Sequence, residues 1–233
     1  MNSPEEYIQK TKSAVLKLFD GINSYNEVLC NAPTPIFNFS SSFSDEEAMA
    51  KARNQAYESW ILENKDTISL SLKAQKEYFA ESFASATLCG SLLQIAAMGI
   101  QLFSQNEEIA EDLPKILRSV IKSKSKLAKF CIGRRVRNVP IGLVIYAGRN
   151  QFNHIDEEKL NELNVTIFKL LASNWSDAAE EVNKDLAFDL EEKLLINFSS
   201  NITGLLGWKS YELYDSDMHS LLIEAESEIS TGS

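Results

Sequence analysis

Residues 82–106 read SFASATLCGSLLQIAAMGIQLFSQN, a long run without a charged side chain between Glu81 and Glu107. A run of this length is either a membrane span or a helix that is buried on nearly every side. Gln94 and Gln101 within the run, and the lack of a basic cluster close to its ends, favour the buried helix. We therefore expect the central helix of a bundle, or one shared with a dimer interface, and no association with a membrane.

The composition is that of a largely helical protein. Nine glycines and five prolines among 233 residues are too few for a turn-rich β-sandwich, and good helix formers dominate long stretches. The first residues contain neither a basic segment nor an apolar run, so we expect no signal peptide and a cytoplasmic protein. Cys30, Cys89 and Cys131 are widely spaced, which favours free thiols over a disulfide framework or a structural zinc site.

Local signals mark the beginnings of helices. Residues 3–6 (SPEE) and 44–47 (SDEE) each form a capping-box pattern that is followed by apolar residues at helical spacing. They predict helices from Ser3 to about Leu29 and, with a break near 64–67, from Ser44 to Phe103. The segments expected from these patterns are an N-terminal helix and loop, 1–43, a helical core, 44–175, and a C-terminal helical extension with an acidic tail, 176–233.

One long segment of the chain is free of acidic residues and strongly basic. From Leu113 to Ile155 there is no Asp or Glu, although the chain as a whole has 33 acidic and 23 basic residues and a net charge of −10. A local basic cleft can hold a polyanion even on an acidic protein. On a helix after Pro114, five basic residues would share one face, namely Lys115, Arg118, Lys122, Lys126 and Lys129. The same pattern also fits an ordinary solvated helix face.

Three further arginines lie in a short loop predicted over 132–140. Arg134, Arg135 and Arg137 carry planar guanidinium groups that suit phosphate, and the loop would bring them close to the segment around Arg149. These three residues and Lys129 are therefore candidate phosphate contacts.

The stretch 147–154 reads AGRNQFNH and holds the best candidate for chemistry. It places one of only two histidines, His154, five residues after Arg149, and Asn150 directly follows that arginine. Histidine can exchange a proton near neutral pH and arginine supplies a fixed cation, so the pair suits phosphoryl chemistry. The other histidine, His219, has no partner pattern around it, and we expect it at the surface.

The helices around this stretch can be placed in two ways. The apolar run 141–147 could be a strand, but in a helical chain we expect a buried helical segment. The acidic residues 156–158 then predict that His154 lies near the amino-terminal turn of a helix that continues to Leu171. If the helix begins earlier, Asn150 and His154 share a face and Arg149 is rotated away by about 140°. Residues 176–195 predict a further helix.

Arg149-Asn150-Gln-Phe-Asn-His154 resembles the R-x4-6-H signature of the HEPN (higher eukaryotes and prokaryotes nucleotide-binding) superfamily, in which a polar residue follows the arginine. The resemblance covers roughly 44–171. It implies an all-α, up-and-down helical bundle of HEPN type, here with additional N- and C-terminal helices, that acts as an endoribonuclease. Relatives are typically homodimers whose two motifs face a shared cleft, and many are toxins or effectors of antiviral defence. Some that pair with an antitoxin carry a tyrosine shortly after the histidine, where this chain has Ile155 and Asp156.

The chemistry that the resemblance implies needs neither a metal nor another cofactor, because the 2′-hydroxyl of RNA is itself the nucleophile. His154 would exchange the proton, Arg149 would stabilise the charge on the phosphorane, and Asn150 would orient the phosphate or His154. The expected RNA-binding residues are Arg134, Arg135, Arg137 and Lys129. Two alternatives stay open: a non-catalytic HEPN-like module that binds RNA, nucleotide or a protein partner as a subunit of a defence complex, and an acidic helical adaptor that docks through 82–106.

Overall fold

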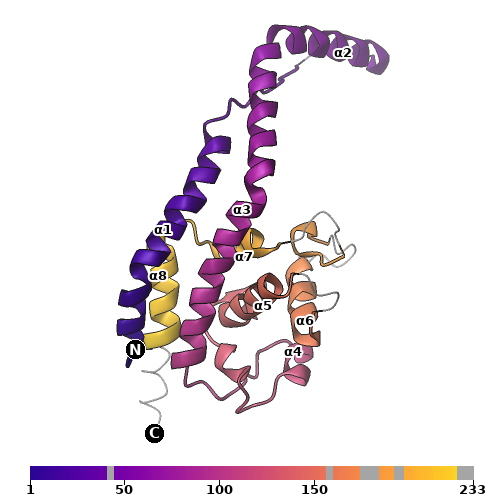
Figure 1. Ribbon diagram of the computed structural model, residues 1–233. Helices are drawn as coiled ribbons and strands as arrows, with labels where there is room; N and C mark the ends of the chain where they lie inside the picture. The colour runs from indigo at the N-terminus through magenta and orange to yellow at the C-terminus, as the bar shows by residue number, and fades with distance from the viewer. Residues whose placement is uncertain (41–44, 156–159, 174–183, 192–196, 225–233) are drawn as a thin grey trace. The chain divides into compact units, whose positions relative to one another are not determined.

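The computed structural model of the chain describes residues 1–40, 45–155, 160–173, 184–191 and 197–224 (Figure 1). These residues form eight α-helices, three short 3-10 or π-helical segments and one two-stranded β-hairpin. The chain is therefore a largely helical protein, as its composition predicted.

The chain forms two compact units. One comprises Met1–Ile22 and Ala84–Ser233, and the other comprises Asn23–Phe83. These bounds differ from those of the three segments expected from the sequence (1–43, 44–175 and 176–233), and that division stays a prediction.

The larger unit contains the apolar run of the sequence as a core helix. Helix α3 (Lys65–Phe103) buries Leu92, Leu93, Ala96 and Ile100 completely. Its last turns run beside the first turns of α1 (Pro4–Cys30) and beside α8 (Tyr211–His219), which continues into the π-helical segment η3 (Ser220–Glu224) (Figure 1). By length and composition alone α3 is also able to cross a membrane, and 56% of its most apolar window is buried within the protein.

Helix α1 begins where the capping pattern predicted. The Ser3 hydroxyl accepts a hydrogen bond from the Glu6 backbone N–H at 3.2 Å. The buried Tyr7 hydroxyl donates to the Ile95 carbonyl at 2.6 Å, which fixes the start of α1 on α3. The predicted amino-terminal helix is confirmed.

Helix α5 (Ile141–Asn153) occupies the middle of the larger unit. It packs against α6 (Glu162–Ala172) and α7 (Ser199–Leu206), and residues 141–145 are all buried. The prediction of a buried helix rather than a strand over 141–147 is confirmed, because burial on all sides stabilises this run despite its β-branched residues.

The basic segment after Pro114 is not one helix, and that expectation was wrong. Helix α4 (Lys115–Val120) has fewer than two turns, Lys124 has a positive φ of 60°, and a 3-10 helix, η1, follows at Ala128–Phe130. A Ser125 hydroxyl that accepts from the Ala128 N–H stabilises this turn instead of a continued α-helix. The five basic residues that were expected on one helix face therefore do not lie on a single helix. These residues are Lys115, Arg118, Lys122, Lys126 and Lys129.

The loop predicted over 132–140 contains the β-hairpin. Strand β1 (Arg135–Val136) pairs antiparallel with β2 (Val139–Pro140). Arg137 and Asn138 form the turn with φ values of 48° and 64°, the conformation that a two-residue hairpin of type I′ requires.

Two further predicted boundaries need correction. Helix α2 (Glu46–Glu63) is capped by Asp45, whose carboxylate accepts from the Ala48 N–H at 3.1 Å, and not by Ser44, which lies outside the described residues. The predicted break falls at Asn64, after which α3 begins. The helix expected over 176–195 is absent from its described part, 184–191, which holds an isolated bridge and the 3-10 helix η2 (Leu186–Phe188).

The smaller unit has little core of its own. None of the residues of α2 is buried, and Phe37 of the preceding loop packs its ring on Tyr57 and Trp60, with centroid distances of 5.1 and 5.7 Å. Large apolar side chains of this unit are exposed, namely Ile36, Met49, Tyr57, Ile61, Leu62, Leu70, Leu72, Phe79 and Phe83.

Candidate active site

The R-x4-H motif lies at the carboxy-terminal end of α5. Arg149 and Asn150 belong to its last turns, and His154 is the C-cap residue, whose backbone N–H donates to the Asn150 carbonyl at 3.0 Å. The expectation that His154 lies at the start of the next helix was wrong, because α6 begins only at Glu162. The structure instead has the alternative arrangement, in which Asn150 and His154 are four residues apart on one helix.

Arg149 is half-buried, and neutral amide oxygens hold its guanidinium group. Its Nε donates to Oε1 of Gln94 at 3.0 Å, and its Nη1 donates to Oδ1 of Asn150 at 3.1 Å. Among the described residues it has no carboxylate partner, and its Nη2 donates no hydrogen bond. Amide oxygens orient a guanidinium without neutralising it, so the charge and the Nη2 edge stay available to an anion.

The amide contacts continue from Arg149 into the neighbouring helices. Asn150, only 6% exposed, donates through Nδ2 to Oδ1 of Asn164 at 3.5 Å, a long and weak hydrogen bond. Oδ1 of Asn161, the N-cap residue of α6, accepts from the Asn164 backbone N–H at 2.9 Å. Because Asn150 is buried and faces Arg149, it is placed to orient the guanidinium.

His154 is exposed at the end of α5. Arg149 precedes it by five residues, which on a helix is about 7.5 Å along the axis and about 140° around it. An exposed imidazole can meet a substrate from solution, as a general acid or base must.

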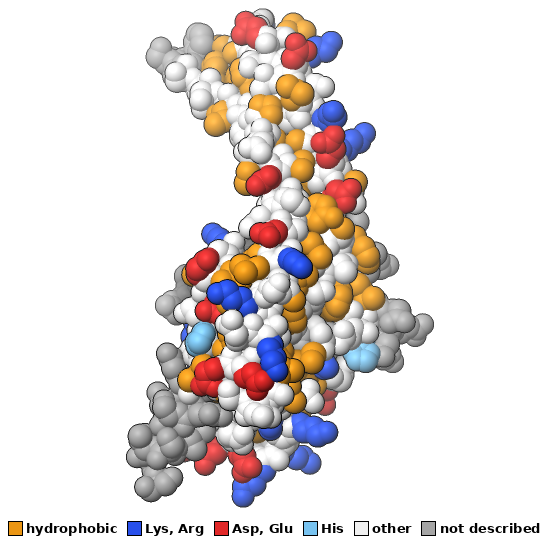
Figure 2. Space-filling model, turned by 60° about the vertical axis from the view of Figure 1, so that its left-hand side comes forward, with side chains coloured by type: hydrophobic (Ala, Val, Ile, Leu, Met, Phe, Trp, Pro, Cys, Tyr) orange, Lys and Arg blue, Asp and Glu red, His pale blue; other side chains and the backbone are white. Residues whose placement is uncertain are grey.

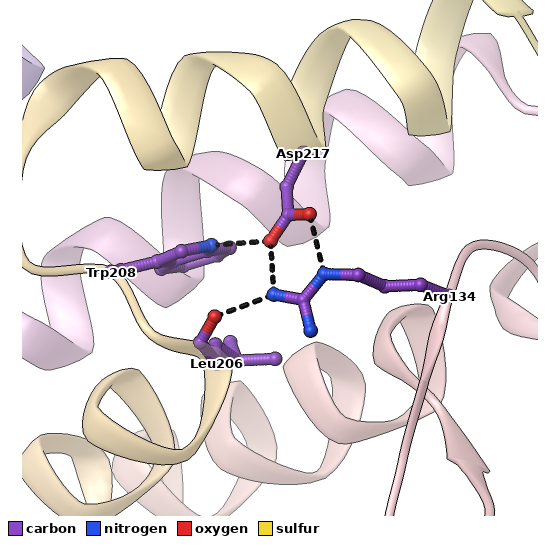
Figure 3. A network of polar contacts seen from close by, with 4 residues as sticks. All are labelled: Arg134, Leu206, Trp208 and Asp217. Atoms are coloured by element: carbon purple, nitrogen blue, oxygen red, sulfur yellow. Dashed lines mark hydrogen bonds and ion pairs between the residues drawn. The ribbon is translucent and has the colours of Figure 1, made fainter.

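Arg134, a predicted RNA contact, forms an ion pair within the chain. Its Nε and Nη2 donate to the two carboxylate oxygens of Asp217 at 2.8 Å each, and Nη2 also donates to the Leu206 carbonyl at 2.5 Å (Figure 3). The indole N–H of Trp208 donates to the same carboxylate at 2.8 Å. The hydrogen bond to Asp217 raises the pKa of Arg134 above its ordinary value.

The other predicted RNA contacts also have partners within the chain. Arg135 pairs with Asp112 at 2.7 Å, and Lys129 donates to the Gln101 carbonyl at 3.2 Å. Arg137 pairs with Asp185 at 2.6 Å and donates to the Leu171 carbonyl. Arg134, Arg135 and Arg137 each form an ion pair with a different aspartate. Within the described part of the chain, these three arginines form no hydrogen bond with the residues around Arg149.

Two residues of this site were not predicted from the sequence. Gln94 and Asn153 belong to the Arg149 network, because the Asn153 Nδ2 donates to the same Gln94 Oε1 at 3.1 Å. Gln94 is 55 residues from Arg149, and its only sequence signal is that a polar residue interrupts an apolar run.

Other groups that could carry chemistry lie apart from this network. His219, with 47% of its side chain exposed, pairs with Asp215 at 3.7 Å. The three cysteines are separate thiols, and the described residues include no cluster of three His, Cys, Asp or Glu side chains that could hold a metal ion. Comparisons of the chain with protein-family models, with curated proteins and with solved structures gave no match.

Proposed function

We propose that the chain is a metal-independent endoribonuclease built on a HEPN-type, up-and-down helical bundle. The observation that supports this most is the guanidinium of Arg149, which amide oxygens hold without neutralising it, at the same helix end as the exposed His154. Arg134, Arg135 and Arg137 are each paired with an aspartate. Arg149 differs from these three, because its partners among the described residues are neutral amides and its charge is available to a substrate phosphate.

The proposed reaction uses RNA as its own nucleophile. One imidazole takes the proton of the 2′-hydroxyl, the 2′-oxygen attacks phosphorus, and the bond to the 5′-oxygen breaks as that oxygen receives a proton. The products are a 2′,3′-cyclic phosphate and a 5′-hydroxyl end. Arg149 stabilises the negative charge that gathers on the phosphorane oxygens, and Asn150 holds Arg149 in place.

A homodimer would complete this site. One chain provides one histidine of the motif, whereas the reaction needs a base on one side of the phosphate and an acid on the other. A second copy that brings its own His154 to the same cleft supplies both. We propose a cytoplasmic toxin or antiviral-defence effector, with an antitoxin or another subunit of a defence complex controlling its activity.

The test is cleavage of single-stranded RNA by the purified protein in EDTA. We expect wild-type protein to give 2′,3′-cyclic phosphate ends, identified by mass spectrometry, and His154→Ala to lower the rate by about 10²–10⁴-fold. Arg149→Ala should do the same. The matched controls are His219→Ala and Arg118→Ala, which remove the same side chains from exposed positions elsewhere. Cleavage that survives at both motif positions, or that stops in EDTA, would overturn the proposal.

A second candidate function is a non-catalytic module that binds a protein partner. The observation that favours it is the exposed apolar surface of the unit Asn23–Phe83, and apolar side chains also lie among charged ones on the face drawn in Figure 2. The adaptor surface expected over 82–106 is largely core, since Leu92, Leu93 and Ile100 are fully buried. A binding module would retain a partner or RNA without forming RNA products.

A further inference from the structure

We propose that Gln94 is a positioning residue of the site, which aims Arg149 and fixes the end of α5 while leaving the guanidinium charge intact. The inference rests on the proposed function, in which Arg149 contacts a phosphate of RNA. It adds to that site a residue from a different helix, α3.

One oxygen atom of Gln94 links both halves of the motif. Its Oε1 accepts from Arg149 Nε at 3.0 Å and from Asn153 Nδ2 at 3.1 Å. Asn153 directly precedes His154, and the two accepted bonds use both lone pairs of the amide oxygen. The guanidinium and the backbone turn that carries the imidazole are therefore tied to the same point on α3.

The packing around Gln94 restricts how this point can move. One turn earlier on α3, a Cβ atom at Gly90 would overlap the ring of Phe152, and a Cβ at Gly148 of α5 would come within 2.9 Å of Leu93. The two helices thus approach closely beside the Gln94–Arg149 bond. A side chain in such a fitted position has few alternative rotamers, so its hydrogen bonds direct the guanidinium.

The chemistry of the amide matters as much as its position. A glutamate has the same shape and would accept the same two hydrogen bonds, but its negative charge would cancel that of Arg149. The aspartate partners of Arg134, Arg135 and Arg137 have this effect on their guanidinium groups. Gln94 gives the orientation that a carboxylate would give and leaves the cation available for phosphate.

The experiment compares Gln94→Glu with Gln101→Glu in the full-length protein. Gln101 lies seven residues further along the same helix and is exposed, so its substitution adds the same charge to α3 away from Arg149. Binding is measured with a 2′-O-methyl RNA oligonucleotide, which lacks the nucleophile, over a series of salt concentrations. Thermal stability and the cleavage rate of unmodified RNA are measured in parallel.

We expect Gln94→Glu to keep the wild-type melting temperature or raise it, because both hydrogen bonds persist and become charge-assisted. It should weaken oligonucleotide binding about tenfold or more, and the slope of log Kd against log salt should fall by about 0.7, the value for one lost phosphate contact on a single strand. Gln101→Glu should change the affinity less than about twofold and leave the slope unchanged. Gln94→Leu, which removes the acceptor but adds no charge, should lower the cleavage rate more than the affinity.

The outcomes separate this inference from the nuclease proposal. The role of Gln94 would be overturned if the two glutamate variants had equal effects on binding. It would also be overturned if Gln94→Glu weakened binding only because the variant had a lower melting temperature and was partly unfolded. Wild-type protein that binds the oligonucleotide with the expected pattern among variants but cleaves nothing would overturn the nuclease and leave Gln94 as the positioning residue of an RNA-binding arginine. Wild-type protein that neither binds nor cleaves RNA would overturn both.

Discussion

Replacement of Asp217 by alanine should cost a large part of the stability of the larger unit. The carboxylate accepts three hydrogen bonds at 2.8 Å, two from Arg134 and one from the indole of Trp208, and only 12% of its side chain is exposed. Removing one partner of a buried ion pair costs about 3–5 kcal/mol. The Arg134 side chain is 47% exposed, and water will solvate part of its charge in the variant, so we expect a loss of about 2–4 kcal/mol.

The assay is urea unfolding monitored by circular dichroism, and thermal unfolding is measured in parallel. For a chain of this size, about 2–4 kcal/mol corresponds to a melting temperature lower by roughly 5–15 °C. Asp217→Asn keeps one oxygen, which in the place of Oδ2 accepts from Arg134 Nη2 and from the Trp208 indole, and it should lose less than Asp217→Ala. A loss below about 1 kcal/mol for Asp217→Ala would refute the reasoning, since it is no larger than the effect of an ordinary exposed ion pair.

The Arg134→Ala variant distinguishes a structural role of Arg134 from a role in RNA binding. If its main role is the ion pair with Asp217, Arg134→Ala lowers stability about as much as Asp217→Ala. If Arg134 contacts RNA, as the sequence suggested, Arg134→Ala weakens RNA binding by an amount that depends on the salt concentration, while stability changes little.

Two further predictions concern thiol reactivity and pH. Burial raises the pKa of Cys131 to about 11 and also raises the pKa of Cys89, whereas Cys30 is exposed. Iodoacetamide at about pH 8 should therefore modify Cys30 first, and mass spectrometry should find Cys89 and Cys131 modified only after unfolding. Burial raises the pKa of Tyr7 from 10.0 to about 12, so the contribution of the neutral Tyr7 hydroxyl to stability is complete below pH 10 and is lost as the pH rises to about 12. Urea titrations of the wild-type protein and of Tyr7→Phe at alkaline pH will detect this loss.

The parts of the fold that local signals specify were predictable. The start of α1 follows from Ser3, Pro4 and Glu6, and burial of the run 82–106 follows from its lack of charge. The end of α5 was misplaced because the acidic residues 156–158 resemble a helix start, whereas the cap of α6 is Asn161.

The surroundings of the site could not be predicted from the sequence in the same way. The motif Arg149-Asn150-His154 is a local pattern, but the partners that decide which arginine keeps its charge come from distant positions. Asp217 lies 83 residues from Arg134, and Gln94 lies 55 residues from Arg149. Only the packing of α3, α5 and α8 brings these residues together, and no local rule of spacing specifies it.

Gly90 contributes no functional group, yet it sets how closely the end of α5 can approach α3, because the ring of Phe152 occupies the space of its missing side chain. Any larger residue there would wedge the two helices apart at the level of Gln94 and stretch the hydrogen bonds that aim the guanidinium. In a saturation library selected for activity, this glycine should therefore tolerate substitution as poorly as the arginine and histidine themselves.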